Sequence, residues 1–203
     1  MNDIDTVDCI KKTLKSRDSN KKEIALYTLL HGEGENNIYL DEIITCAGSS
    51  NDKVRLVAIM VLSSINLKKI VPILEKSLND KLFKIRSLAA ITLAKYKNEK
   101  AIPALKAIII NDIRDHSIHK RAIEALGKYK REDLLSIFEQ MLSHRRKASK
   151  LKAIDAIKQI HSEKALQLLI CSEKKETDGN ILSRIRGAIQ SFNIKIKTPD
   201  TDN

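Results

Sequence analysis

The histidines are the first residues to consider, because their types and spacing could support metal binding or proton transfer. His116 and His119 stand three residues apart, with Asp112 and Asp115 nearby. On a helix the two imidazoles would share one face and could bind a metal ion. The spacing fixes no third ligand, however, and such pairs near a helix start are common by chance. We therefore assign no metal site.

Motifs for covalent or phosphate chemistry are also missing. The sequence has no nucleophile–base pair, no glycine-rich phosphate loop and no dinucleotide fingerprint. Cys9, Cys46 and Cys171 lie far apart without CxxC or Cys/His spacing, which argues against a disulfide framework and a zinc site. Each lies in an apolar helical stretch, so we expect ordinary buried thiols. No catalytic residue and no cofactor are assigned.

Charge is the stronger signal. Lysine and arginine number 37 against 26 aspartates and glutamates, which gives a net charge of +11. This excess predicts attraction to an acidic partner, which could be nucleic acid, an anionic protein face or a membrane surface. Lysine-rich helical proteins also carry such charge for solubility alone.

The positive charge gathers in the C-terminal half, where HRRKASKLK at 144–152 is the densest run. Cations at a helix start oppose the helix dipole by roughly a few tenths of a kcal/mol each, so their presence there suggests a use elsewhere. We predict a partner-binding band made of His119, Lys120, Arg145, Arg146, Lys147, Lys150, Lys152, Arg184 and Arg186. The alternative is a solvated charged edge without a partner.

Nucleic acid is one candidate partner for this band. Neutralising phosphates needs only clustered lysine and arginine, whereas readers of single strands usually add aromatic stacking platforms. Aromatic residues make up only 3% of the chain, and most fall at expected core positions. Binding to the nucleic-acid backbone therefore remains open, and base recognition is not expected.

An internal repeat defines the elements that must position these residues. Its period is roughly 31 to 33 residues, a length typical of solenoids. VRLVAIMVLSSI from Val54 aligns with IRSLAAITLAKY from Ile85 and IHKRAIEALGKY from Ile118. Weaker copies begin at Lys21, Ser149 and Ile181, which makes about six.

Each copy predicts a hairpin of two helices. Apolar residues from Val54 to Ile65 recur at the i, i+3, i+4, i+7 spacing of a buried helix face, and a second amphipathic segment precedes each of these helices. The low aromatic content favours helix packing over a sandwich or barrel. A single hairpin cannot bury both apolar faces, so neighbouring copies must stack.

The stretch KIRSLAAITLAKYKNEKAIPALKAI resembles a HEAT repeat, in particular the short HEAT-like variety found in phycobilin lyases. The likeness rests on an Asp before the second helix, the Val/Ile-Arg that follows, and the AIPAL opening at 101–105. It covers residues 4–193 and weakens in the outer copies, as terminal caps do. It implies an all-α, right-handed α-solenoid of about six HEAT-like helical hairpins. We expect one domain over 1–193 and a flexible tail over 194–203.

The resemblance also implies roles for particular residues. In HEAT-like repeats the Asp and Arg positions form a ladder between neighbouring copies, which here would involve Asp52, Arg55, Asp80 and Arg86. The second helices of such a stack line its concave side. The basic band would then lie on that side.

These inferences together predict a non-catalytic scaffold that presents a basic concave surface to an acidic partner protein. Sequence-independent nucleic-acid binding through the same band is the alternative. A lyase or DNA glycosylase type of enzyme, or a subunit of one, is a further alternative. HEAT-like glycosylases use tryptophans around the damaged base, and this chain has none.

The first residues, MNDIDTVDCIKK, carry acids where a signal peptide needs basic residues. No apolar segment approaches the roughly 20 residues that span a bilayer. We therefore expect a cytoplasmic protein. Its oligomeric state does not follow from the sequence.

Overall fold

The computed structural model describes residues 3–32, 36–111 and 115–196. Within these ranges the chain forms twelve α-helices and four short 3-10 helices, with no strand. The chain divides into two compact units, Met1–Tyr96 and Lys97–Asn203. The predicted all-α class is confirmed.

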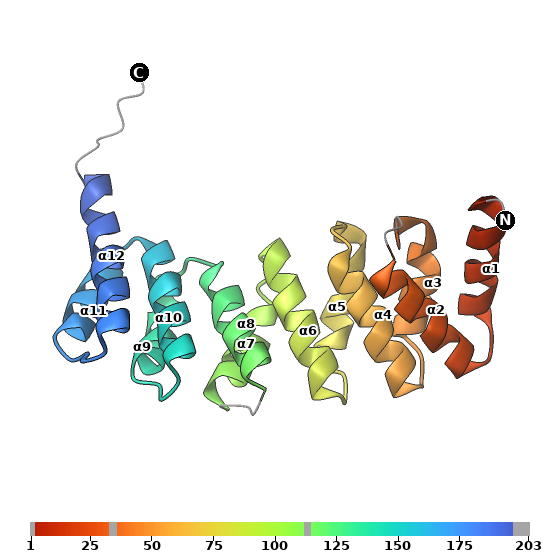
Figure 1. The fold of residues 1–203 in the computed structure, drawn as a ribbon, viewed down its shortest axis with the longest axis horizontal. Helices are drawn as coiled ribbons and strands as arrows, with labels where there is room; N and C mark the ends of the chain where they lie inside the picture. The colour runs from red at the N-terminus through yellow and green to blue at the C-terminus, as the bar shows by residue number, and fades with distance from the viewer. Residues whose placement is uncertain (1–2, 33–35, 112–114, 197–203) are drawn as a thin grey trace, which may run out of the picture. The chain divides into compact units, whose positions relative to one another are not determined.

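The first unit consists of three helical hairpins (Figure 1). Its elements are α1 (Asp3–Lys15), α2 (Ser19–His31), η1 (Asn36–Tyr39), α3 (Leu40–Ala47), α4 (Asp52–Ser64), η2 (Lys68–Ile70), α5 (Val71–Ser77), α6 (Phe83–Leu93) and η3 (Ala94–Tyr96). Helix α4 packs against α2 on one side and α6 on the other.

The second unit repeats this arrangement with three more hairpins (Figure 1). Its elements are α7 (Ala101–Ile110), α8 (His116–Gly127), η4 (Glu132–Leu134), α9 (Leu135–Leu142), α10 (Lys147–Ile160), α11 (Glu163–Glu173) and α12 (Gly179–Ile196). Helix α10 packs between α8 and α12. The remainder of the expected tail, 197–203, lies outside the described residues, and residues 194–196 belong to α12.

Within each unit, small residues allow the second helices of neighbouring hairpins to approach closely. Ala58, Ala89, Ala122 and Ala153 occupy the same repeat position, and all four have no exposed surface. The stripe from Val54 to Ile65 is likewise buried, as its spacing predicts. Each second helix therefore turns its apolar stripe towards its neighbours and leaves its polar residues on the opposite face.

The cysteines differ from expectation. Cys46 is buried, and its Sγ donates to the Leu14 carbonyl at 3.6 Å, while burial raises the pKa of its thiol. Cys9 and Cys171 are exposed, so the prediction of buried thiols is wrong for both. They lie on outward faces of amphipathic helices, and position within an apolar stretch did not distinguish those faces.

Half-buried tyrosines tie consecutive copies together. The Tyr96 hydroxyl lies 3.4 Å from the Ile65 carbonyl and 3.3 Å from that of Leu67, in the previous hairpin. Tyr129 occupies the equivalent place one repeat later and donates to the Asn98 carbonyl. Burial, helped by nearby Glu99, raises the pKa of Tyr129 to about 12. Each hydroxyl thus satisfies backbone oxygens in a joint that has no helical partner for them.

A left-handed residue follows the second helix in three successive copies. Lys97, Lys130 and His161 have φ angles of 52°, 53° and 49°. This conformation ends a helix by turning the chain, and glycine is its usual occupant. This conformation could not be predicted from the sequence, because lysine and histidine are not typical of that position.

An arginine ladder connects two hairpins of the first unit. Arg55 of α4 binds Asp80 with both guanidinium arms, Nε to Oδ2 at 2.8 Å and Nη2 to Oδ1 at 3.1 Å. Arg55 also lies 3.0 Å from Asp52, and its Nη1 donates to the carbonyls of Ser49 and Ser50. The guanidinium therefore holds its own joint and the next joint in register.

Arg86, one repeat later, repeats half of this arrangement. Its Nη1 donates to the Asp80 and Lys81 carbonyls at 2.7 and 2.9 Å, and its guanidinium lies over the Phe83 ring. Lys81 adds an ion pair with Asp52 at 2.9 Å, which together with Arg55 holds the pKa of Asp52 below its usual value. The Asp and Arg positions of the repeat thus bind the joints between helices.

The ladder makes a prediction for stability. Arg55 and Asp80 have side chains only 11% and 12% exposed, so Asp80→Asn should lower the free energy of unfolding by about 1.5–3 kcal/mol. Arg55 holds the pKa of Asp80 below 3.8, so this contribution is complete above that pH and is lost as pH falls through the lowered value. Urea titrations over an acid pH series would measure both effects. Asp41→Asn, which breaks an exposed pair with Lys69, is the control and should change little.

Two glycines of the second unit differ in what the fold requires of them. A Cβ on Gly127 of α8 would lie 2.8 Å from the Ala156 Cβ of α10, so this glycine lets the two helices touch. A Cβ on Gly187, within α12, would meet nothing within 4 Å. Packing therefore explains the first glycine and not the second.

The same substitution should consequently have opposite effects at the two positions. We expect Gly127→Ala to destabilise the protein by about 1–3 kcal/mol, because α8 and α10 must separate. Gly187→Ala should stabilise it by about 0.5–1 kcal/mol, because alanine is the better helix former. Thermal and urea unfolding of both variants would test this. A loss of stability in Gly187→Ala would contradict the packing described.

Candidate partner-binding groove

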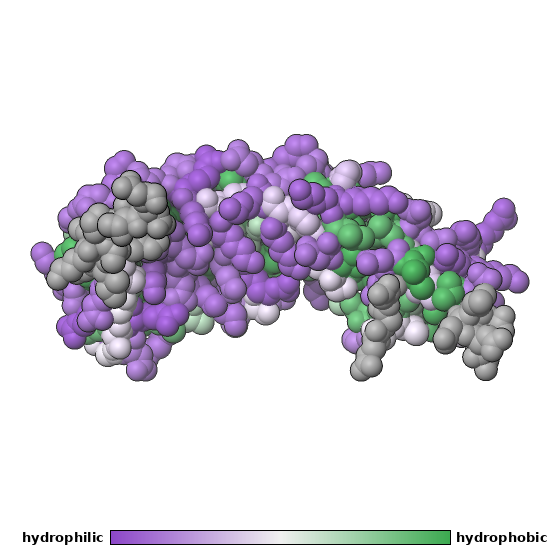
Figure 2. All heavy atoms as spheres, turned by 90° about the horizontal axis from the view of Figure 1, so that it is seen from above, coloured by the Kyte–Doolittle hydropathy of each residue, from purple (hydrophilic) through white to green (hydrophobic). Residues whose placement is uncertain are grey.

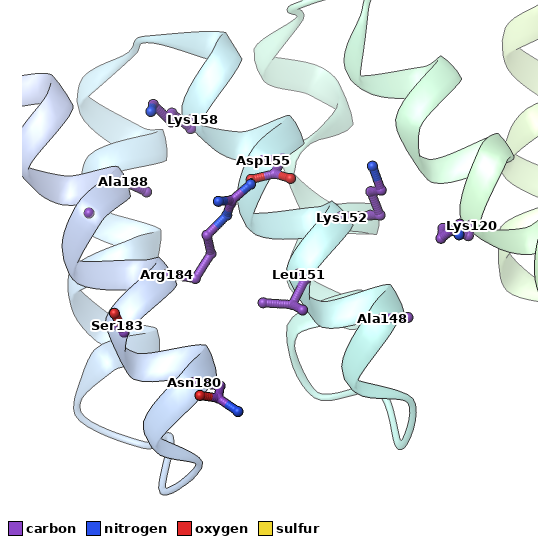
Figure 3. Close-up of a pocket in the computed structure, with 11 residues that line it drawn as sticks. Lys120, Ala148, Leu151, Lys152, Asp155, Lys158, Asn180, Ser183, Arg184 and Ala188 are labelled. Carbon is purple, nitrogen blue, oxygen red and sulfur yellow. The ribbon is translucent and has the colours of Figure 1, made fainter.

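Polar side chains on the outer faces of α8, α10 and α12 line an open groove in the second unit (Figure 3). Its volume is about 880 Å³. The residues that line it are Lys120 from α8, Ala148, Leu151, Lys152, Asp155 and Lys158 from α10, and Asn180, Ser183, Arg184, Gly187 and Ala188 from α12. All three helices are second helices of their hairpins, so the groove lies on the face opposite their buried stripes.

Positive charge dominates the lining, which contains four cationic side chains and one carboxylate among the described residues. Arg184 binds the carboxylate, Asp155, with Nε at 2.8 Å and Nη2 at 2.6 Å, which raises the pKa of Arg184. Figure 3 shows Arg184 reaching from α12 to Asp155 on α10. Lys152 pairs with Glu124 of α8 at 3.1 Å.

Two lysines of the groove carry unneutralised charge. In the part of the chain that the structure describes, no carboxylate lies within ion-pair distance of Lys120 or Lys158. Lys120 is exposed and Lys158 is half-buried. The groove therefore keeps a surplus of positive charge on a surface with few acids to offset it.

The floor of the groove is apolar and made of small side chains. Leu151 points into the gap between α10 and α12 (Figure 3), where Ala188 is almost fully buried. Gly187 adds no side chain to this floor. Elsewhere the second unit shows mostly hydrophilic surface in the view of Figure 2, whereas hydrophobic surface gathers on the first unit.

The predicted basic band does not form one continuous surface. Only Lys120, Lys152 and Arg184 line the groove. Three other members bind acids of α11 or the joint after it. These ion pairs are Lys147 with Asp178, Lys150 with Glu176 at 2.7 Å, and Arg186 with Glu173 at 2.7 Å. Lys147 and Lys150 hold the pKa of Asp178 and of Glu176 below their usual values.

Arg145 and Arg146 also lie away from the groove. Both precede α10, with Arg146 at its N-cap position, where its backbone N–H donates to His144 Nδ1 at 3.0 Å. They flank the start of the helix and do not line its outer face. Of the densest run of positive charge, 144–152, only Ala148, Leu151 and Lys152 line the groove.

His119 was placed in the band incorrectly, because its side chain is only 1% exposed. Its Nε2 lies 3.1 Å from the Ile109 carbonyl of α7, and its Nδ1 lies 3.2 Å from the Ser149 hydroxyl of α10. The carbonyl can only accept, so Nε2 carries the hydrogen and, in the neutral ring, Nδ1 accepts from Ser149. His119 thus joins three helices from inside.

This placement also separates the histidine pair considered for metal binding. His116 is exposed while His119 is buried, so the two imidazoles do not share a surface. Asp112 lies outside the described residues. Among the residues that the structure describes, no cluster of three potential metal ligands occurs.

Lys158 and Asp155 belong to the groove, and sequence reasoning missed both. The signal was present as periodicity: the groove residues of α10 fall at Ala148, Leu151, Lys152, Asp155 and Lys158, which is one helical face. Those of α12 follow the same spacing from Asn180. The helical spacing of the polar face therefore contains the information that places Asp155 and Lys158 beside Lys152.

Comparisons with known proteins agree with this architecture. Residues 40–119 match the family model described as HEAT repeats. Among curated proteins none matches the sequence significantly. None of the described helices is long and apolar enough to cross a membrane.

Solved structures with the same fold cover nearly the whole chain. An engineered protein of the Northeast Structural Genomics Consortium is 17% identical, with a TM-score of 0.64 over 96% of this chain and 98% of its own. A designed armadillo repeat protein in complex with the peptide (KR)4 is also 17% identical, with a TM-score of 0.67 over 91% and 98%. The complex of CpcE and CpcF of phycocyanin lyase from Nostoc sp. PCC7120 is 20% identical, with a TM-score of 0.61 over 90% and 75%. The expected HEAT-like repeat and α-solenoid class are confirmed.

The buried position of His119 gives a test that separates a structural role from a surface one. His119→Leu should lower the free energy of unfolding by about 1–3 kcal/mol, because the Ile109 carbonyl and the Ser149 hydroxyl lose their partner. Urea unfolding monitored by circular dichroism would measure the loss. His116→Leu is the matched control and should leave stability nearly unchanged, since His116 is exposed. Equal effects of the two variants would contradict the buried arrangement.

Proposed function

We propose that this HEAT-like repeat protein is a non-catalytic binding module that holds an acidic partner protein on the face formed by α8, α10 and α12. The observation that carries the proposal is the groove itself, whose described lining contains four cations and one carboxylate. Outside the groove, Lys147, Lys150 and Arg186 of the same unit are paired with acids. Within it, Lys120 and Lys158 have no carboxylate at ion-pair distance among the described residues.

Electrostatics gives the physical reason. Partner carboxylates near Lys120 and Lys158 would form ion pairs that the chain does not supply, so they would add attraction without breaking existing pairs. Lysine side chains suit this role on an adaptable surface, because a flexible stem can follow a carboxylate. A net charge of +11 would also speed the approach of an acidic protein.

Structures with this fold support the proposal by example. The designed armadillo repeat protein was solved with a basic peptide, and CpcE was solved as a complex with CpcF. Both are cases of a helical repeat surface that binds another chain. The basic groove of this chain would select the opposite charge from that of the (KR)4 peptide.

Nucleic acid is the weaker candidate for the same surface. No aromatic side chain is among the described residues that line the groove, so it lacks a platform on which bases could stack. The apolar floor offers nothing to a phosphate backbone. An acidic protein can use both the charge and the floor.

The test is a pair of charge reversals that change net charge equally. Lys120→Glu/Lys158→Glu removes the unneutralised groove cations, and Lys128→Glu/Lys174→Glu reverses two exposed lysines outside the groove. Binding of fluorescein-labelled polyglutamate and of a random-sequence DNA duplex would be measured by anisotropy at several salt concentrations. We expect the groove variant to weaken polyglutamate binding roughly tenfold, about 1.4 kcal/mol, and the control to change it far less.

Two outcomes would contradict the proposal. Equal weakening by both variants would show that net charge alone, and not the groove, attracts the peptide. Tighter binding of the DNA, lost only in the groove variant and falling steeply with salt, would make nucleic acid the partner.

A further inference from the structure

We infer that the groove binds an extended acidic segment of its partner and holds one apolar side chain of that segment over Gly187, between flanking carboxylates. This inference rests on the proposed function and names the chemistry of the ligand. Three features carry it: a glycine that the fold does not need, an apolar floor, and cations that line the same groove.

Gly187 is the central observation. Glycine within a helix costs about 0.5–1 kcal/mol relative to alanine, so a folding reason is expected for it. Packing supplies none, because a Cβ at this position would meet nothing within 4 Å, in contrast to Gly127 against Ala156. The missing side chain instead leaves space in the groove, since Gly187 is one of the residues that line it. A glycine of this kind allows another chain to approach closely.

The floor around Gly187 is suited to an aliphatic group. Leu151 of α10 points into the gap towards α12 (Figure 3), and Ala188 of α12 is only 3% exposed. An apolar side chain placed there would cover Leu151 and the α12 backbone at Gly187. Burial of a leucine-sized group contributes about 1.5–3 kcal/mol, which a purely electrostatic contact would not provide.

The cations define what surrounds this apolar side chain. Lys120 lies on α8, and Lys158 lies near the end of α10. The groove face of α10 from Ala148 to Lys158 is about 15 Å long at 1.5 Å per residue. An extended segment of about five residues has that length, and its side chains alternate in direction. Carboxylates before and after the central apolar residue can then pair with lysines of the groove.

A second copy of this chain is a poor occupant. Each copy carries a net charge of +11, and the groove is among its basic surfaces, so two copies repel at this face. An acidic segment removes that repulsion and neutralises Lys120 and Lys158. The ligand that we propose for the groove is thus an acidic peptide with one apolar residue between its carboxylates.

The experiment compares two fluorescein-labelled peptides of equal charge. Both consist of glutamates around one central residue, which is leucine in the first peptide and serine in the second. Anisotropy titrations would use the full-length chain and two variants, Gly187→Leu and Gly179→Leu. Gly179 is a matched control, because it belongs to the same helix, a Cβ there meets nothing within 4 Å, and it does not line this groove.

We expect the wild-type protein to bind the leucine peptide about tenfold more tightly than the serine peptide. Gly187→Leu should abolish that preference while leaving the serine peptide and its salt dependence nearly unchanged. Gly179→Leu should keep the preference. Thermal unfolding would accompany the titrations, and Gly187→Leu should unfold no earlier than the wild type, since its side chain enters open space.

The failures of the two proposals are distinguishable. Equal binding of both peptides by the wild type, or a leucine preference that survives Gly187→Leu, overturns the inference about Gly187 while the acidic-partner function stands. Failure of both peptides to bind overturns the proposed function and the inference with it. A preference lost equally in Gly179→Leu would place the apolar contact elsewhere on α12 and overturn the inference alone.

Discussion

The structure depends on the inability of one helical hairpin to bury two apolar faces by itself. Within each unit the second helices therefore pack against one another, as α10 does between α8 and α12. Close packing demands small residues where the helices cross, which explains Ala122 and Ala153, both without exposed surface. Gly127 shows the constraint at its limit, because even one Cβ there would overlap α10.

Polar groups fix the register that apolar packing leaves loose. Hydrophobic contact is non-directional, so two stacked hairpins could slide unless specific bonds prevent it. Arg55 binds joint carbonyls and Asp80, and the hydroxyls of Tyr96 and Tyr129 bind carbonyls in the joint before their own hairpin. His119 does the same inside the second unit, with Ile109 and Ser149. Residues that look chemically active in the sequence are thus largely used to hold joints together.

The groove is a consequence of the same packing. When the apolar stripe of each second helix turns inward, the opposite faces of α8, α10 and α12 must form a shared outer surface. Packing does not constrain which side chains lie on that surface. Its charge and the open space beside Gly187 can therefore serve to bind a partner. This separation leaves the outer face of the repeat free to carry the binding site that we propose.

The sequence by itself determined the all-α class, the position of the hairpins and the buried stripes, because helical periodicity and the repeat are local properties of the chain. Bounds such as 54–65 for a second helix agree closely with α4. It also marked Arg55 and Asp80, through their place in the repeat. It misjudged His119 and the basic run at 144–152, since a charged residue's exposure depends on which way its helix faces.

Only the tertiary structure decided which cations act together. Lys147, Lys150 and Arg186 meet acids of α11 or the joint after it, whereas Lys120 and Lys158 meet none among the described residues. Those partners are distant in sequence, and ion pairing depends on separation in space, not along the chain. For the same reason the open space beside Gly187 could not be predicted from the sequence, because such a space exists only once the neighbouring helices are packed.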